Sequence, residues 1–131
     1  MCLQTLTKNF NPPREGVGAG WKLFDRDNAG KYISLYFNYM PYSPGTWYTS
    51  SNGTININSE EYEQGFHIYT NVEAARQQLR YSYSYIELRK VEYDDVVAIG
   101  TESLYVDDGG ELKPVPITVA KQMRIVPDEA V

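Results

Sequence analysis

Residues 65–79 (GFHIYTNVEAARQQL) constrain the fold more than any other stretch of the chain, because they predict a strand, a turn and a helix in succession. Residues 66–69 are aromatic or β-branched apart from one histidine, which favours a strand. Thr70 and Glu73 then have the spacing of a capping box, in which each side chain bonds a free backbone N–H at the start of a helix. The stretch therefore predicts a strand that leads directly into a helix.

The helix predicted at about residues 71–80 is the principal helix of the chain. Val72, Ala75 and Leu79 recur at helical spacing and form one narrow apolar stripe, which suits packing on a sheet. Arg80 lies near the C-terminal end of this helix, where the helix dipole favours positive charge.

Strands and turns are predicted for most of the remaining chain. Residues 8–20, rich in proline and glycine, predict a loop, and residues 27–30 predict a turn between two strands. In the second of these strands, residues 31–39, the apolar side chains alternate with tyrosine and serine, which predicts one buried face. The apolar side chains of that face are Ile33, Leu35 and Phe37.

A β-hairpin is predicted around Asn52-Gly53, the strongest short hairpin signal in the chain, with strands at residues 47–51 and 54–58. Residues 60–64 are acidic and predict an exposed linker. A change in apolar parity near Arg89-Lys90 predicts a β-bulge in the following long strand.

The last strand carries apolar residues of one parity, which predicts a single buried face along its length. These residues are Val115, Ile117, Val119, Met123 and Ile125. With a turn at residues 107–110 before it, this strand completes a single α+β domain over residues 1–131, a twisted, mostly antiparallel sheet with one principal helix. The predicted core holds Ile33, Leu35, Phe37, Phe66, Ile68, Val72, Ala75, Leu79, Ile86, Leu88, Val97, Ile117, Val119 and Ile125.

Charge and composition exclude several classes of function. A net charge of −5 and a pI near 4.8 argue against a nucleic-acid-binding protein, which needs a basic surface for the phosphates. The sequence has no apolar run of about 20 residues to cross a membrane and no signal-peptide pattern, so we expect a cytoplasmic protein. Cys2 is the single cysteine, which rules out a disulfide within the chain and a thiolate zinc site.

Tyrosine is unusually frequent, with 12 in 131 residues. One interpretation is a sheet whose outer face is coated with tyrosine; the other is a recognition surface, since tyrosine supplies contact area at low entropic cost.

Two segments resemble ligand-binding loops without the context that such loops require. Residues 16–20 are rich in glycine but lack the preceding strand and following helix of a phosphate loop. Residues 25–30 begin like a calcium loop, but Ala29 and Tyr36 stand where oxygen ligands are needed. We therefore expect no metal and no cofactor, and the adjacent acidic pairs of the predicted turns suit solvated surface better than catalysis.

His67 has three interpretations. Flanked by Phe66 and Ile68, it faces the opposite side of its strand, where it bonds a tyrosine or a carbonyl in the simplest case. A ligand contact is the second interpretation and a general base the third, so no residue is assigned a catalytic role.

A binding site is predicted where aromatic side chains and the start of the helix converge on one edge of the sheet. An anion suits a helix N-terminus and a planar ring suits exposed aromatics, so the guest is a nucleotide-like ligand or an acidic loop of a partner protein. The alternative is that the aromatics complete two small cores. The predicted site residues are Trp21, Tyr42, Trp47, His67, Tyr69, Thr70 and Asn71.

The order of motifs over residues 65–126 resembles the small C-terminal domain of tailed-phage rIIB-like proteins. The resemblance rests on Gly65-Phe66-His67, the helix with Ala74-Ala75, Asp94-Asp95-Val96-Val97 and a closing strand through Arg124-Ile125-Val126. It implies a phage source, an accessory role and a location in the cytoplasm of an infected bacterium. Residues 65–75 also resemble the strand and alanine-rich helix of ADP-ribosyltransferases, although residues 1–40 contain no histidine for NAD and Arg14 and Arg26 fall in predicted loops.

The function expected from these patterns is that of a non-catalytic accessory binding protein, acting on a host protein or on a small nucleotide-like ligand. An ADP-ribosyltransferase-like enzyme using NAD, or a degenerate relative of one, is an alternative, and a small structural protein of the virion is another. The sequence leaves the oligomeric state open, including a homodimer.

Overall fold

The fold is described from a computed structural model, which places residues 3, 5–6, 17–34, 41–57, 60–80, 85–105 and 112–130. Predictions for Leu35, Phe37 and the turn at residues 107–110 lie outside the described residues. The elements, in chain order, are β1 (Thr5–Leu6), β2 (Gly18–Arg26), β3 (Tyr32–Ser34), β4 (Tyr48–Thr49), β5 (Thr54–Ile57), β6 (Glu60–Glu63), β7 (Phe66–Tyr69), α1 (Val72–Arg80), β8 (Glu87–Tyr105) and β9 (Leu112–Ala130).

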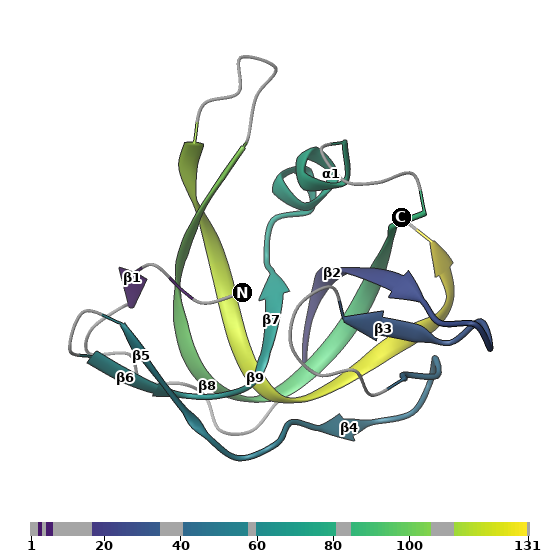
Figure 1. Cartoon of the computed structure of the whole chain (residues 1–131), viewed down its shortest axis with the longest axis horizontal. Coiled ribbons are helices and arrows are strands. Elements are labelled where there is room, and N and C mark those ends of the chain that lie inside the picture. Colours follow the sequence, from purple (N-terminus) through teal and green to yellow (C-terminus); the bar gives the residue numbers. More distant parts are fainter. Residues whose placement is uncertain are drawn as a thin grey trace.

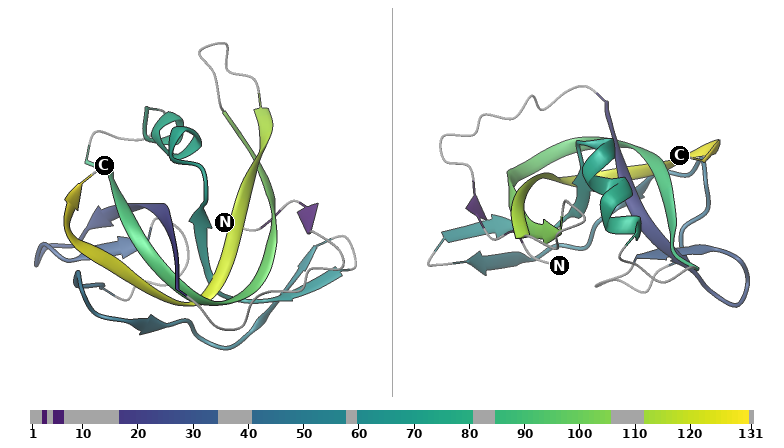
Figure 2. Two further views of the ribbon diagram at one scale, coloured as in Figure 1. Left: turned by 180° about the vertical axis from the view of Figure 1, so that it is seen from behind. Right: turned by 90° about the horizontal axis from the view of Figure 1, so that it is seen from above.

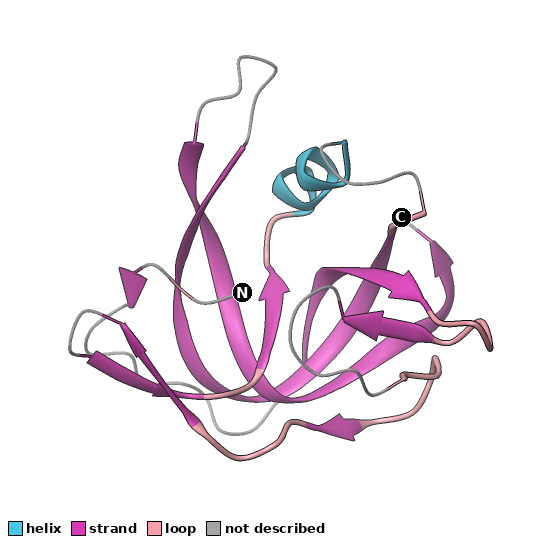
Figure 3. Ribbon diagram, viewed as in Figure 1, coloured by secondary structure: helices cyan, strands magenta, loops and turns pink. Residues whose placement is uncertain are grey.

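Two long strands, β8 and β9, organise the fold (Figure 1). They pair antiparallel from Arg89–Ala130 to Tyr105–Leu112 and curve together into a U, with α1 over its mouth. The view from behind shows the same curvature (Figure 2), and strands dominate the structure (Figure 3). The expected α+β fold, mostly antiparallel with one principal helix, is confirmed in this sheet-dominated form.

Strand pairing closes a ring. β8 pairs with β2, β2 with β7, β7 with β9, and β9 with β8, all antiparallel. The β2–β7 contact is a single pair, Trp21 with Tyr69. Gly20 permits this approach, because a Cβ there would lie 2.5 Å from Ile68 Cγ2 and 2.7 Å from the Tyr69 carbonyl oxygen. Gly18 to Gly20 therefore belong to β2 rather than to the predicted loop.

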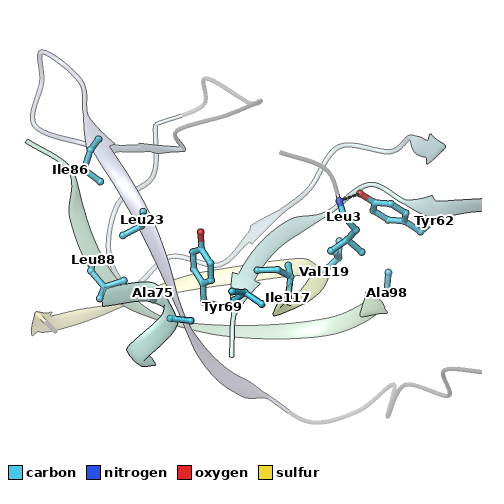
Figure 4. Packing of buried hydrophobic residues seen from close by; sticks show 12 residues of the cluster. Leu3, Leu23, Tyr62, Tyr69, Ala75, Ile86, Leu88, Ala98, Ile117 and Val119 are labelled. Carbon is cyan, nitrogen blue, oxygen red and sulfur yellow. Dashed lines mark hydrogen bonds between the residues drawn. The ribbon is translucent and has the colours of Figure 1, made fainter. Parts of the chain in front are cut away.

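The buried side chains form two clusters. The helix-side cluster is made of Leu3, Leu23, Tyr62, Tyr69, Ala74, Ala75, Ile86, Leu88, Ala98, Val115, Ile117 and Val119. Ten of its members are labelled in Figure 4. The Tyr42 cluster is made of Phe24, Tyr32, Tyr42, Phe66, Ile68, Val91, Ala120, Met123 and Ile125.

Neighbouring residues of one strand enter different clusters, because successive side chains of a strand point to opposite faces. Leu23 and Phe24 separate in this way in β2, and Ile68 and Tyr69 separate in β7. Both faces of the sheet are therefore packed at these strands.

The last strand departs from the prediction of one buried face. Val119 belongs to the helix-side cluster, whereas Met123 and Ile125 belong to the Tyr42 cluster. The β8–β9 register shifts between Val96 and Ala98, and this irregularity accompanies the exchange of faces. A second shift lies between Arg89 and Val91, close to the bulge predicted near Arg89-Lys90. Its extra residues are in β9, between Ile125 and Ala130, whereas β8 pairs with β2 without a break there.

The hairpin predicted at Asn52-Gly53 is wrong. β4 pairs with β9, through Tyr48 and Met123, and β5 pairs with β6. The acidic residues predicted as a linker thus form β6. The long edge of β9 offers backbone partners to β4, and this tertiary pairing outweighs the local turn preference.

The predicted face of the strand after residues 27–30 is also wrong. The hairpin itself is confirmed, since β2 and β3 pair and Gly30 has a positive φ of 81°. However, Tyr32 is buried and Ile33 is only half-buried. Tyr32 packs edge-to-face on Phe24, with ring centroids 5.6 Å apart, so the aromatic side chain occupies the inner position.

Candidate functional site

Three of the predicted site residues lie on the side of the sheet that packs against the helix. Trp21 packs against the helix-side cluster and pairs in register with Tyr69, which is buried in that cluster. His67 lies on β7 two residues before Tyr69, with its ring 6.3 Å from that of Tyr62. The structure thus brings Trp21, His67 and Tyr69 into one neighbourhood.

Tyr42 and Trp47 are placed elsewhere. Tyr42 is 1% exposed and packs edge-to-face on Tyr48 and Phe66, with centroid distances of 4.8 and 5.8 Å. Burial raises the pKa of Tyr42. Trp47 is exposed and contacts Arg124. The placement of Tyr69 and Tyr42 in separate clusters agrees with the alternative in which aromatics complete two small cores.

The start of α1 is capped by Asn71, so the predicted capping box of Thr70 and Glu73 is wrong. Asn71 Oδ1 accepts from the backbone N–H groups of Glu73 and Ala74, at 2.9 and 3.2 Å, and the Asn71 carbonyl accepts from that of Ala75. Glu73 instead forms an ion pair with Arg76 at 2.6 Å. With these donors taken by Asn71, the helix N-terminus offers little to an anionic ligand.

A polar cluster consisting of Lys22, His67 and Glu102 lies beside Tyr62; Lys22 is half-buried, and the side chains of His67 and Glu102 are almost fully enclosed. His67 Nδ1 is 3.1 Å from Glu102 Oε1, and the two side chains are 9% and 2% exposed. Lys22 Nζ donates to the His67 carbonyl oxygen at 2.9 Å. Strand β2 supplies the lysine, β7 the histidine and β8 the glutamate.

Burial and charge determine protonation in this cluster. Burial lowers the pKa of Lys22 to about 8, although the Glu102 carboxylate opposes this effect. Burial also lowers the pKa of His67, against the raising effect of its hydrogen bond to Glu102. A neutral His67 donates from Nδ1 to the Glu102 carboxylate, which accepts only.

This geometry holds the His67 imidazole in one tautomer, as a general base would require. However, the ring is only 9% exposed, so a substrate has little access to it. Glu102 Oε2 is buried and has no hydrogen-bond partner among the residues that the structure describes. The sequence patterns singled out His67 and missed both Lys22 and Glu102. The sequence did contain a signal for Glu102, because alternation along a strand places it on the same face as Ala98, which is buried.

An exposed aromatic surface, the Trp47 surface, consists of Trp47, Arg124 and Glu92. Trp47 is 43% exposed, with Arg124 Cζ 5.9 Å from its ring centre. Arg124 Nε donates to Glu92 Oε1 at 2.9 Å, and Arg124 and Glu92 are cross-strand partners in β9 and β8. The guanidinium is therefore held in place over the ring.

The turn before β4 positions Trp47. The Gly45 N–H donates to the Ile125 carbonyl at 2.8 Å, with Gly45 at a positive φ of 87°. The Ser43 N–H donates to the Tyr48 hydroxyl at 2.7 Å. These two hydrogen bonds thus fix the chain segment that carries Trp47 before any partner arrives.

Within the described ranges, no group of three or more histidine, cysteine, aspartate or glutamate side chains could hold a metal ion. The one helix of the described residues is too short and too polar to cross a membrane.

Arg26, which was predicted to lie in a loop, is the last residue of strand β2, and its side chain donates a hydrogen bond to Glu87.

Comparison of the chain with protein-family models, with curated proteins and with solved structures gives no match in any of the three.

Proposed function

We propose that the protein is a non-catalytic accessory binding protein of phage type, acting on a host protein through the Trp47 surface. The observation that carries the proposal is a tryptophan that is 43% exposed and yet held in place by Arg124. Tryptophan and arginine are the side chains most enriched among residues that dominate binding energy at protein interfaces.

Preorganisation supports this surface as a binding site. Because turn and cation–π contacts already fix Trp47, a partner would not have to offset the entropy of ordering it. The net charge of −5 favours a partner with basic groups around its contact patch, through electrostatic steering.

A nucleotide-like ligand has weaker support from the geometry. Tyr42 is buried, the helix N-terminus is occupied by Asn71, and His67 is nearly enclosed. A protein partner needs none of these groups, because the Trp47 ring is itself accessible.

The test is affinity purification of the tagged full-length protein from bacterial cells, followed by calorimetry with the purified partner. We expect Trp47→Ala to weaken binding by about 30-fold or more, the loss typical of a dominant interface residue. Tyr85→Ala is the matched control, because Tyr85 is also an exposed aromatic residue, at 57%. We expect that variant to bind within about twofold of wild type, as a peripheral residue would.

Equal binding by wild type and Trp47→Ala would refute the assignment of the surface. An enzymatic function would replace the proposal if the protein consumed NAD in the presence of cell extract and His67→Ala abolished that turnover. The two experiments use the same purified full-length chain, so their outcomes are compared directly.

A further inference from the structure

The outer edge of β8 carries an added strand. β1 pairs antiparallel with β8, Thr5 with Thr101 and Leu6 with Gly100, while the opposite edge of β8 pairs with β9 at the same residues. The Thr5 and Thr101 hydroxyl oxygens are 2.5 Å apart. In Figure 1, β1 appears as a short separate arrow beside the long curved pair.

A buried leucine anchors this added strand. Leu3 is 1% exposed in the helix-side cluster, and its N–H donates to the Tyr62 hydroxyl at 3.1 Å. Figure 4 shows Leu3 beside Val119, with Tyr62 and Ala98 nearby. We call Leu3 together with β1 the β1 strap, and its seat between β6 and β8 the strap groove.

The strap groove depends on Gly100. A Cβ at this position would lie 1.9 Å from the Thr5 carbonyl oxygen and 3.0 Å from Leu3 Cδ1. Its three nearest atoms all belong to the β1 strap. A methyl group at residue 100 would therefore clash with the strap before it reached any other part of the structure.

We propose that the strap groove is a strand-addition site whose occupant, the β1 strap, can be supplied by a second copy of the chain. Addition of an extended segment to a sheet edge combines backbone pairing with a pocket for an alternate side chain, here the leucine pocket. Two identical chains that exchange such a segment form a symmetric dimer without any new contact. The groove fits the sequence of this chain, and a second copy carries the same sequence.

The strap pairs with β8 over far fewer residues than β9 does. β1 contributes two residue pairs, whereas β8 and β9 are paired along almost their whole length. Segments with so few contacts open locally while the rest of the structure stays folded. This inference concerns a surface other than the Trp47 surface, and it does not depend on the proposed function.

Two complementary full-length variants test the exchange. Leu3→Asp disables the strap and leaves the groove empty, while Gly100→Ala blocks the groove and releases an intact strap. By analytical ultracentrifugation we expect each variant alone to be monomeric and an equimolar mixture to contain a heterodimer. Thr101→Ala, a control that removes only a hydroxyl contact, should give no heterodimer with Leu3→Asp.

A mixture that sediments as the sum of its parts, with both variants folded by circular dichroism, would overturn the proposal. If either variant fails to fold, hydrogen exchange of the wild-type chain provides the test instead. We expect the amides of β1 to exchange at least about tenfold faster than those of β9 near Val119, as local opening requires. Equal protection of the two strands would show a permanently fixed strap and refute reversible exchange.

Discussion

Raising the pH should stabilise the protein through Lys22. Burial lowers the pKa of this lysine from 10.5 to about 8 in the folded state, so between these values the unfolded chain binds the proton more strongly. Stability therefore rises with pH in this window. The full difference, 10.5 minus 8, is about 2.5 pH units and corresponds to about 3 kcal/mol, since one pH unit corresponds to about 1.4 kcal/mol.

Only part of this gain is accessible, because tyrosines begin to titrate near pH 10. Burial raises the pKa of Tyr32 and Tyr42, which lowers folded-state stability as the pH passes the unfolded value. Between about pH 7 and about pH 9, the two lysine pKa values predict a gain on the order of 1 kcal/mol. His67 adds little in that range, since its pKa is lowered from 6.5.

Urea denaturation at the two pH values measures this gain, with Lys22→Met as the comparison. The variant lacks the titrating amine, so its stability should rise by about 1 kcal/mol less than that of the wild type across this pH range. Comparing slopes with pH, rather than absolute stabilities, removes the effect of losing the hydrogen bond to the His67 carbonyl. Identical pH dependence in the two proteins would refute burial of a charged Lys22 as the cause.

The remaining predictions concern stability and are measured by urea denaturation. Asn71→Ala should cost about 1 kcal/mol, whereas Thr70→Ala should be nearly neutral; the reverse would restore the capping box. Ile68→Ala should cost about 2–5 kcal/mol because Ile68 is 0% exposed, and a loss below about 0.5 kcal/mol would contradict its place in the core. Val119→Asp should prevent folding, because it places a carboxylate at a position that is also 0% exposed. Gly20→Ala should separate β2 from β7 and lower the denaturation midpoint sharply, and an unchanged midpoint would argue against their close contact.

Local patterns predicted those elements whose signals lie within a few residues. The helix at about residues 71–80 is found at Val72–Arg80, and strand β7 is found at Phe66–Tyr69. The β2–β3 hairpin also follows from nearby residues. Each of these depends on backbone preferences and apolar periodicity that a short window contains.

The candidate site was less predictable than the fold. His67 was singled out as the only histidine, but its partner Glu102 lies 35 residues away and Lys22 lies 45 residues away in the chain. No local pattern links residues that meet only when β2, β7 and β8 come together. Trp47 was predicted as a site residue, while its contact with Arg124 depends on the pairing of β4 with β9.

The sequence by itself determined the helix, the positions of most strands and the apolar character of the core, because periodicity and capping act over a few residues. The tertiary structure decided which strands pair: β4 pairs with β9, although the Asn52-Gly53 turn favours a hairpin between β4 and β5. It also decided which face each residue takes, so that Tyr32 is buried in place of Ile33. Strand partners and faces are set by contacts between distant segments, whose combined energy exceeds the preference of any single turn.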